Sequence, residues 1–176
     1  MKRMSETIFE SNTTITEEAR TIIVDKLKNA LKEELNAWYG YIIVSEFLAG
    51  PERKCIVDFY RDTAKDELED HAYWIMQRIN ELDGTIEDIT VSPAACLSAE
   101  HPYIMPLWNE NGVVDIERSL QTNIENEKGA IETYKELVEI TNQYGDWTTN
   151  RKCKEILADE EEHLGELEDF VADIVN

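Results

Sequence analysis

Apolar residues recur at helical intervals along most of the chain, and glycine and proline interrupt the pattern at a few places. The first periodic stretch begins near Thr16 and carries Ile23, Leu27 and Leu31 on one side. Spacings of three and four residues place such side chains on one face of an α-helix. The interruptions fall at Gly50-Pro51, at Gly84, over residues 93–112 and at Gly145. This pattern predicts four long helices, over about 16–49, 51–83, 113–142 and 147–176.

The lengths of the connections predict how these helices pack. The turns at Gly50-Pro51 and over residues 142–146 are short, so each joins an antiparallel pair of helices. The connection from Gly84 to Gly112 is long enough to cross a bundle from end to end. We therefore predict an all-α fold, a four-helix bundle with one long crossover between its second and third helices. Residues 1–16 form a polar lead-in, and residues 17–176 form the bundle domain.

The two predicted hairpins repeat each other at an offset of 93 residues, the difference between 127 and 34. The offset relates Glu34 to Glu127, Ala37 to Ala130, Tyr41 to Tyr134, Asp66 to Asp159 and Glu67 to Glu160. A histidine follows the last pair in each hairpin, His71 in the first and His163 in the second. Several agreements at one offset indicate that the two hairpins form an internal repeat.

The four repeated glutamates are predicted to lie together in the core. Glu34 and Glu67 are equally far from the first turn, and Glu127 and Glu160 straddle the second. Residues equidistant from the turn of an antiparallel helix pair sit at the same height. Each glutamate also interrupts an apolar stripe. The sequence thus predicts one layer of inward-facing carboxylates.

Burying carboxylates in such a layer requires compensation. An unpaired buried carboxylate costs several kcal/mol, and neighbouring ones repel each other. We expect no Lys or Arg on the same stripes. Either the carboxyl groups are protonated, in a metal-free structural bundle, or divalent cations neutralise them. Imidazole ligands beside carboxylates suit iron or manganese.

The histidines differ in their spacing from the glutamates. His163 follows Glu160 by three residues, which places both side chains on one face of a helix. His71 follows Glu67 by four, and Asp70 occupies the three-residue position. One inserted residue in a π-bulge would return His71 to the ligand position. We favour His71, with Asp70 as the rival ligand.

Composition narrows the classes of function. Among 176 residues, 17 are Lys or Arg and 38 are Asp or Glu, so the formal charge is −21. A nucleic-acid surface needs a basic face, and the start of the chain offers only Lys2 and Arg3, so we expect no direct DNA binding. Apolar runs are too short for a membrane helix. Three cysteines do not suit a secreted disulfide framework, so we expect a cytoplasmic protein.

The glutamate and histidine pattern resembles the ferritin-like di-iron family, in which two helices supply one Glu each and two supply Glu-x-x-His. Residues 34–37, 66–71 and 156–163 resemble bacterioferritin subunits, and the chain is still more similar to the Dps-like ferritins called thioferritins. This resemblance implies two iron ions per subunit, with manganese as an alternative metal. The implied ligands are Glu34, Glu67, His71, Glu127, Glu160 and His163.

The resemblance also implies roles within and beside this site. Glu67 and Glu160 correspond to residues that include bridging carboxylates in the family. Tyr41 is similar in position to a tyrosine next to the centre of bacterioferritins, although an ordinary core tyrosine is the alternative. Thioferritins carry a cysteine pair near the metals, for which Cys96 and Cys153 are candidates, and Cys55 has no assigned role.

The activity implied is that of a ferroxidase. Fe(II) would be oxidised by hydrogen peroxide or dioxygen and stored in a hollow homo-oligomeric shell, a dodecamer, which protects against oxidative damage. A dimanganese catalase or a rubrerythrin-like peroxidase could use the same site, although the Cys-x-x-Cys pairs of a rubredoxin module are missing from this chain. A metal-free structural bundle is the remaining alternative.

Overall fold

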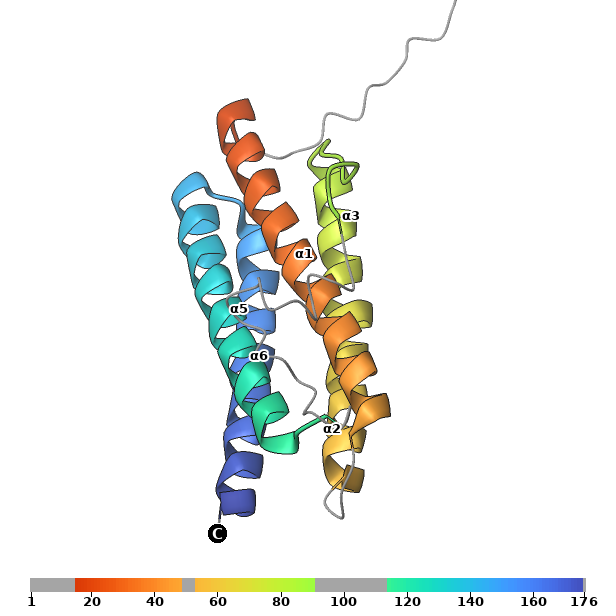
Figure 1. The fold of residues 1–176 in the computed structure, drawn as a ribbon. Helices are drawn as coiled ribbons and strands as arrows, with labels where there is room; N and C mark the ends of the chain where they lie inside the picture. The colour runs from red at the N-terminus through yellow and green to blue at the C-terminus, as the bar shows by residue number, and fades with distance from the viewer. Residues whose placement is uncertain (1–14, 49–52, 91–113, 176) are drawn as a thin grey trace, which may run out of the picture.

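The structure is a computed structural model that describes residues 15–48, 53–90 and 114–175. It consists of four helical rods (Figure 1). The first rod is α1, Glu17–Phe47, and the second is built of α2, Arg53–Lys65, a π-helix η1, Asp66–Ala72, and α3, Tyr73–Glu81. The third is α5, Ile116–Tyr144, and the fourth is α6, Trp147–Val175. The predicted all-α fold is confirmed, and the predicted lead-in lies mostly outside the described residues.

Local side-chain chemistry sets where α1 and α5 begin. The hydroxyl of Thr16 accepts a hydrogen bond of 3.2 Å from the N–H of Ala19, so α1 starts where the sequence predicts. The carboxylate of Asp115 accepts one of 3.0 Å from the N–H of Arg118. This cap delays the start of α5 to Ile116, three residues after the predicted position.

The ends of α3 and α5 use different devices. Gly145 closes α5 in the left-handed conformation, with φ 74°. After α3, which ends near the predicted interruption at Gly84, the left-handed residue is Asp83, with φ 57°. Gly84 serves close packing instead, because a Cβ there would lie 2.7 Å from Cγ1 of Val24.

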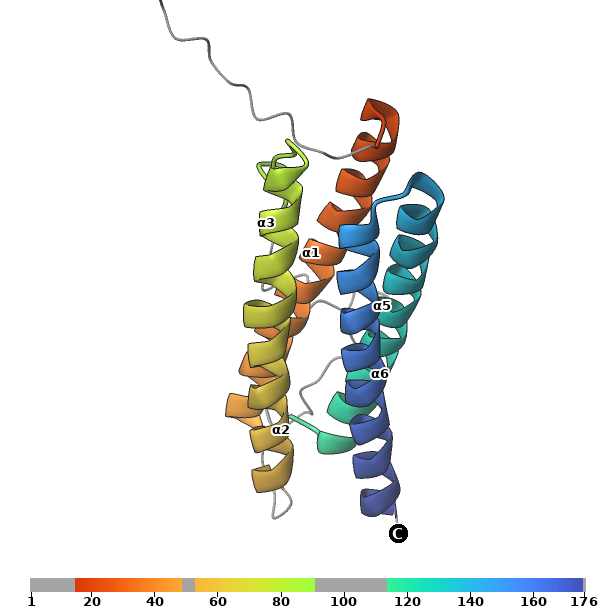
Figure 2. The same cartoon turned by 180° about the vertical axis from the view of Figure 1, so that it is seen from behind.

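The rods run in directions that require a long crossover. The second rod and α5 ascend in Figure 1, while α1 and α6 descend. The end of α3 and the start of α5 consequently lie at opposite ends of the bundle (Figures 1 and 2). Residues 91–113 of the connection lie outside the described residues. A parallel bridge joins Leu48 to Val114 near the start of α5.

The apolar core is divided into two clusters. One contains Ile23, Leu27 and Ile79, and the other contains Val44, Ile56, Leu120 and further apolar residues. Along each rod the boundary between them falls at the glutamates and histidines of the predicted layer. The polar layer therefore crosses the middle of the core. No helix in the described ranges is long and apolar enough to cross a membrane.

The expectation that no basic residue lies on the buried stripes is wrong for Arg78 of α3, which is buried. Its guanidinium donates hydrogen bonds of 2.7 Å to Asp146 and 2.8 Å to Thr149. Asp146 also accepts hydrogen bonds from the N–H and the hydroxyl of Thr149 at the start of α6, so Arg78 ties the two hairpins together at one end of the bundle. It compensates Asp146 and not the glutamate layer.

Candidate metal centre

The π-helix η1 decides which residue follows Glu67 into the core. Seven residues, Asp66–Ala72, adopt the wider turn, as the spacing of the histidine suggested. Both Glu67 and His71 are consequently buried, and Oε2 of Glu67 lies 3.1 Å from Nδ1 of His71. Asp70 is exposed and belongs to neither of the ligand groups formed by the described residues.

All six residues predicted as ligands are brought together between the four rods. They form two groups in which one oxygen or nitrogen from each residue lies within 4.8 Å of the others. The first group is Glu34, Glu67, His71 and Glu160, and the second is Glu67, Glu127, Glu160 and His163. Glu67 and Glu160 belong to both groups. A carboxylate shared in this way can bridge two cations.

The histidines face the shared carboxylates from opposite hairpins. Nδ1 of His71 lies 3.2 Å from Oε2 of Glu34 and 3.3 Å from Oε1 of Glu160. Nδ1 of His163 lies 3.7 Å from Oε1 of Glu67 and 3.6 Å from Oε2 of Glu160. The ring centroids are 6.3 Å apart. Each imidazole thus presents the same nitrogen to the centre.

Two buried tyrosines bind the unshared glutamates. The hydroxyl of Tyr41 donates a hydrogen bond to Oε1 of Glu127, and that of Tyr134 donates one to Oε1 of Glu34. Burial and the adjacent carboxylates raise the pKa of both tyrosines well above the usual value, so both remain donors. The sequence reasoning assigned no role to Tyr134. The internal repeat, which pairs it with Tyr41, was the signal that could have found it.

Two aspartates face the outer nitrogens of the histidines. Oδ2 of Asp159 lies 3.4 Å from Nε2 of His71, and Oδ2 of Asp66 lies 3.9 Å from Nε2 of His163. Each aspartate belongs to the hairpin opposite its histidine, and the 93-residue offset relates them. Carboxylates in this position orient imidazole ligands. The sequence reasoning noted this pair without assigning it a function.

The centre brings four buried glutamates together with two histidines, so acidic groups outnumber basic ones. Burial, and then repulsion from neighbouring glutamates, raises the pKa of Glu67, Glu127 and Glu160. Burial also acts to raise the pKa of Glu34, but hydrogen bonds to Glu67 and His71 outweigh it and lower that pKa. Burial acts to lower the pKa of His71, and the surrounding carboxylates outweigh it and raise that pKa.

The donor atoms fit divalent cations. Within the described part of the chain, Oε1 of Glu67, Oε2 of Glu160 and Nδ1 of His163 are buried and make no hydrogen bond. Buried polar atoms are rarely left unpaired in native proteins. Carboxylate oxygen beside imidazole nitrogen is a donor set of first-row divalent metals. These unpaired atoms all point into the two ligand groups, so cations there would satisfy them.

Cys153 lies on α6 and is buried. Burial, followed by the charges of Asp146 and Glu34, raises the pKa of its thiol to about 12. Cys55 is exposed. Cys96 lies outside the described residues, so its pairing with Cys153 remains a prediction.

Comparisons with known proteins agree with this architecture. The family model described as the ferritin-like domain matches residues 24–175. A dodecameric thioferritin, the bacterioferritin-related protein of Bacteroides fragilis, is similar in structure, with a TM-score of 0.72 and 30% sequence identity. That likeness covers 89% of this chain and 88% of the thioferritin. No curated protein matches the sequence.

A second solved structure shows the same fold at lower sequence identity. It is a ferritin-like di-iron-carboxylate protein from Bacillus anthracis, with a TM-score of 0.70 and 20% identity. The likeness covers 87% of this chain and 97% of that one. The family match spans nearly all of the bundle, including every residue of the two ligand groups. The chain belongs to the ferritin-like family.

Proposed function

We propose that this protein is a ferroxidase that binds two Fe(II) ions as substrates and oxidises them with hydrogen peroxide or dioxygen. One observation carries the proposal: two buried groups of carboxylate and imidazole ligands share Glu67 and Glu160. This arrangement suits a pair of adjacent cations, one in each group. A lone structural metal would not require the sharing.

The adjacency of two iron ions matches the electron demand of the oxidant. Cleavage of the O–O bond of hydrogen peroxide takes up two electrons and two protons and yields two water molecules. Each Fe(II) supplies one electron and becomes Fe(III). Metal pairs held about 3.5–4 Å apart can act together on one small molecule. The ligand set therefore supports a two-electron reaction that avoids one-electron reduction of peroxide.

The protein side chains have distinct roles in this proposal. Glu67 and Glu160 hold the two ions together, and Glu34 and Glu127 each complete one group. Tyr134 and Tyr41 fix these terminal carboxylates by hydrogen bonds. The shared burial of the glutamates excludes bulk water. The oxidised ions then leave for storage, which empties the site for another pair.

We also propose that the protein forms a hollow dodecameric shell in which ferric mineral collects, removing iron and peroxide together. The similarity to a dodecameric thioferritin supports this assembly. The formal charge of −21 suits a protein that attracts cations. It also underlies the expectation that the shell does not bind DNA directly.

The test is an anaerobic titration with Fe(II), followed by hydrogen peroxide or dioxygen. We expect two Fe(II) per chain to bind and to be oxidised faster by protein than in free solution. Glu127→Gln and Glu160→Gln should abolish the rapid oxidation of Fe(II). The matched control Glu161→Gln, at an exposed position next to Glu160 on α6, should retain it. Equal rates in all variants would refute the proposal.

The same kinds of measurement distinguish the alternative functions. A dimanganese catalase would evolve dioxygen from peroxide after loading with Mn(II), without net oxidation of Fe(II). A rubrerythrin-like peroxidase would consume peroxide only with an added electron donor. A metal-free structural bundle would bind neither metal and gain no stability from them.

A further inference from the structure

The start of α6 carries a tryptophan that lies almost entirely on the surface. Trp147 is 66% exposed, more than any other large apolar side chain of the described residues. Within those residues its indole ring forms no aromatic or cation–π contact. A single exposed apolar side chain is ordinary on a protein surface, so its surroundings decide whether it has a function. Tryptophan and arginine are the residues most enriched at the energetic centres of protein interfaces.

Basic side chains accompany Trp147 along α6. Arg151 and Lys154 follow it by four and seven residues, which places the three side chains on one face of the helix. All three are exposed, and together they are named the Trp147 surface. Residues 147–154 contain three basic residues and no acidic one, in a chain with 38 acidic and 17 basic residues. The Trp147 surface is thus a basic patch on an acidic protein.

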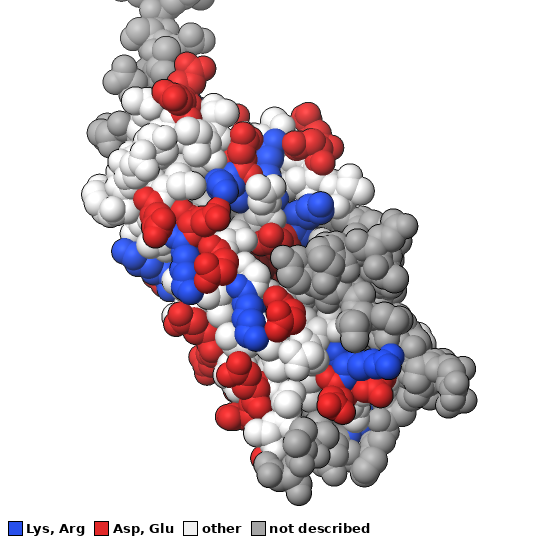
Figure 3. All heavy atoms as spheres, turned by 60° about the vertical axis from the view of Figure 1, so that its left-hand side comes forward, with Lys and Arg blue, Asp and Glu red and all other residues white. Residues whose placement is uncertain are grey.

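Contacts within the chain compensate little of this positive charge. Over the described ranges, Arg151 lies 3.7 Å and Lys152 lies 3.9 Å from one carboxylate, that of Glu155, and Lys154 forms no ion pair. On the face drawn in Figure 3, by contrast, Lys and Arg side chains lie interspersed with Asp and Glu. Three cations beside one carboxylate leave a positive surplus at the start of α6.

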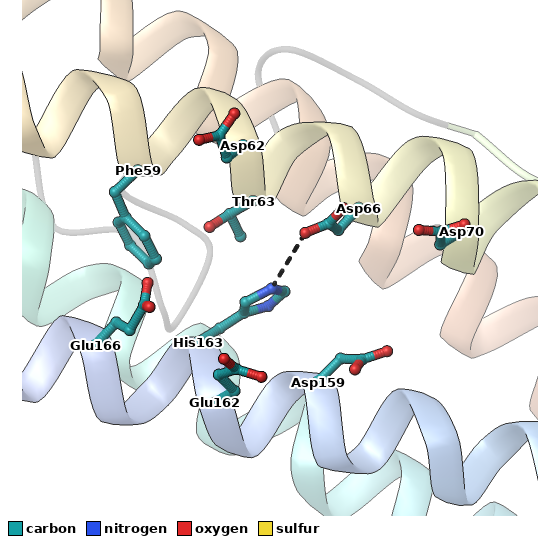
Figure 4. Close-up of a pocket in the computed structure, with 9 residues that line it drawn as sticks. All are labelled: Phe59, Asp62, Thr63, Asp66, Asp70, Asp159, Glu162, His163 and Glu166. Atoms are coloured by element: carbon teal, nitrogen blue, oxygen red, sulfur yellow. Dashed lines mark ion pairs between the residues drawn. The ribbon is translucent and has the colours of Figure 1, made fainter.

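The charges of α6 are segregated in an order that does not stabilise the helix itself. Residues 155–173 contain nine acidic residues and no Lys or Arg. Three of these acids, Asp159, Glu162 and Glu166, line a pocket together with aspartates of the second rod (Figure 4). A helix dipole favours acids near the start and bases near the end, but α6 has no acid in its first turn and no base in its last. The order of charges therefore favours a contact outside the helix.

A hydrogen-bonded network holds the backbone from which Trp147 projects. The carboxylate of Asp146 accepts hydrogen bonds from the guanidinium of Arg78 and from the N–H of Thr149. The N–H of Trp147 itself donates one of 3.1 Å to the carbonyl of Gly145. A side chain presented from an ordered backbone loses less conformational freedom on binding, which favours association. Trp147 is therefore placed as a preorganised anchor.

We propose that the Trp147 surface is a contact between copies of this chain. Trp147 is buried against the neighbouring copy, and Arg151 and Lys154 pair with carboxylates of that copy. The inference rests on the proposed shell and names a surface that holds neighbouring chains together in it. The formal charge of −21 makes a second copy an acidic partner, which complements the basic patch.

The charge of the Trp147 surface also determines the symmetry of the contact. A two-fold contact centred on this surface would place it against itself and oppose like charges. A contact with a different, acidic surface of the next copy avoids this repulsion. Each copy then both supplies the Trp147 surface and receives that of a neighbour. Contacts of this head-to-tail kind generate closed rings, which suit a hollow shell.

The first test follows the environment of Trp147. The difference between the unsubstituted protein and Trp147→Phe isolates its fluorescence from that of the other three tryptophans. In the assembled shell we expect an emission shifted to the blue and protected from quenching by acrylamide, compared with protein diluted until the shell dissociates. A shell in which acrylamide quenches Trp147 as strongly as in the dissociated chain would overturn the contact alone. A chain that never assembles would also refute the proposed shell.

The second test weakens the contact. Trp147→Ser removes the anchor, and Arg151→Glu combined with Lys154→Glu reverses the charge. The control, Lys128→Glu combined with Lys135→Glu, makes the same charge change at exposed positions of α5. Circular dichroism confirms that all variants are folded.

Truncating a tryptophan anchor weakens an interface by about 30-fold or more. The concentration at which the shell dissociates, measured by analytical ultracentrifugation, should rise by at least that factor in Trp147→Ser. The charge-reversed variant should also dissociate, most strongly at low salt. The control should remain assembled. If both variants assembled as the control does, the Trp147 surface would not be a contact between copies.

The third test identifies the surface that receives Lys154. Shells assembled from a mixture of isotope-labelled and unlabelled chains are treated with a carbodiimide, which joins a lysine to a carboxylate in contact with it. Mass spectrometry should find Lys154 linked to Asp or Glu in peptides that combine a labelled with an unlabelled chain. Absence of such mixed links would contradict the pairing of Lys154 with a neighbouring copy.

Discussion

Neutralising one glutamate of the buried layer should change metal-free stability and metal binding in opposite directions. The informative substitutions are Glu127→Gln, which affects one ligand group, and Glu160→Gln, which affects both. Each removes a negative charge and keeps the shape of the side chain. Without metal, repulsion within the layer falls and the variant should unfold at a higher temperature. With metal, a ligand is missing and the stabilisation by metal should fall.

The magnitude of the first effect follows from the geometry. Two unit charges 4.8 Å apart, the span of each ligand group, repel by about 3.5 kcal/mol at an effective dielectric constant near 20. Protonation already relieves part of this repulsion, because the pKa of Glu127 and that of Glu160 are raised. A gain of about 1–3 kcal/mol remains. One kcal/mol shifts the midpoint by roughly 2–4 °C in a chain of this size, so metal-free midpoints should rise by about 2–12 °C.

The second effect follows from ligand linkage. At a hundredfold excess over its dissociation constant, each bound ion stabilises the folded state by about 2.7 kcal/mol. The unsubstituted chain should therefore gain about 5 kcal/mol from two ions, Glu127→Gln about half of that, and Glu160→Gln close to none. The contrast between the two variants tests the sharing of Glu160.

The assay is thermal unfolding by circular dichroism, with and without Co(II). Glu161→Gln, at the exposed neighbour of Glu160, is the matched control and should behave as the unsubstituted chain. The reasoning would be refuted if Glu127→Gln lowered the metal-free midpoint while leaving the gain from Co(II) intact. That result would mean that the carboxylates stabilise the bundle by themselves.

Three further predictions concern the buried Arg78, the cysteines and the dependence of stability on pH. Arg78→Met should destabilise the protein by about 3–5 kcal/mol in urea unfolding, because Asp146 would keep a buried, unpaired charge; a loss below 1 kcal/mol would contradict this. In a Cys96→Ser variant at pH 8, a thiol reagent should modify exposed Cys55 rapidly and buried Cys153 slowly, since the pKa of Cys153 is raised to about 12; equal rates would contradict the burial of Cys153. Finally, the pKa of Glu67, of Glu127 and of Glu160 is raised above the ordinary value of 4.5. The stability that these groups contribute to the metal-free fold is therefore fully present below about pH 4.5, and it is lost as the pH rises through the raised pKa values. Metal-free midpoints measured from pH 5 to 8 should fall, and constant or rising midpoints would contradict this.

Much of the fold could be predicted from the periodicity of apolar residues, because a long helix repeats its buried positions every three or four residues. The ligand layer follows from the internal repeat combined with the symmetry of antiparallel hairpins. The position of His71 needed one further step, since its spacing from Glu67 fits the layer only if the helix widens locally. The structure has that widened turn in η1.

Other features depend on contacts between segments distant in sequence. Arg78 interrupts an apolar stripe, and the sequence alone does not show that Asp146 of the opposite hairpin accepts a hydrogen bond from it. The left-handed residue after α3 is Asp83, while Gly84 packs closely on Val24, and both depend on how the segment after α3 meets α1.

A crystal structure of the protein soaked anaerobically with Fe(II), with anomalous data collected at the iron absorption edge, tests the proposed centre most directly. We predict two iron peaks in the core of each chain, about 3.5–4 Å apart. Glu67 and Glu160 should contact both ions, Glu34 and His71 one of them, and Glu127 and His163 the other. A single peak, or iron confined to the surface while the six side chains remain as they are, would contradict a two-iron centre.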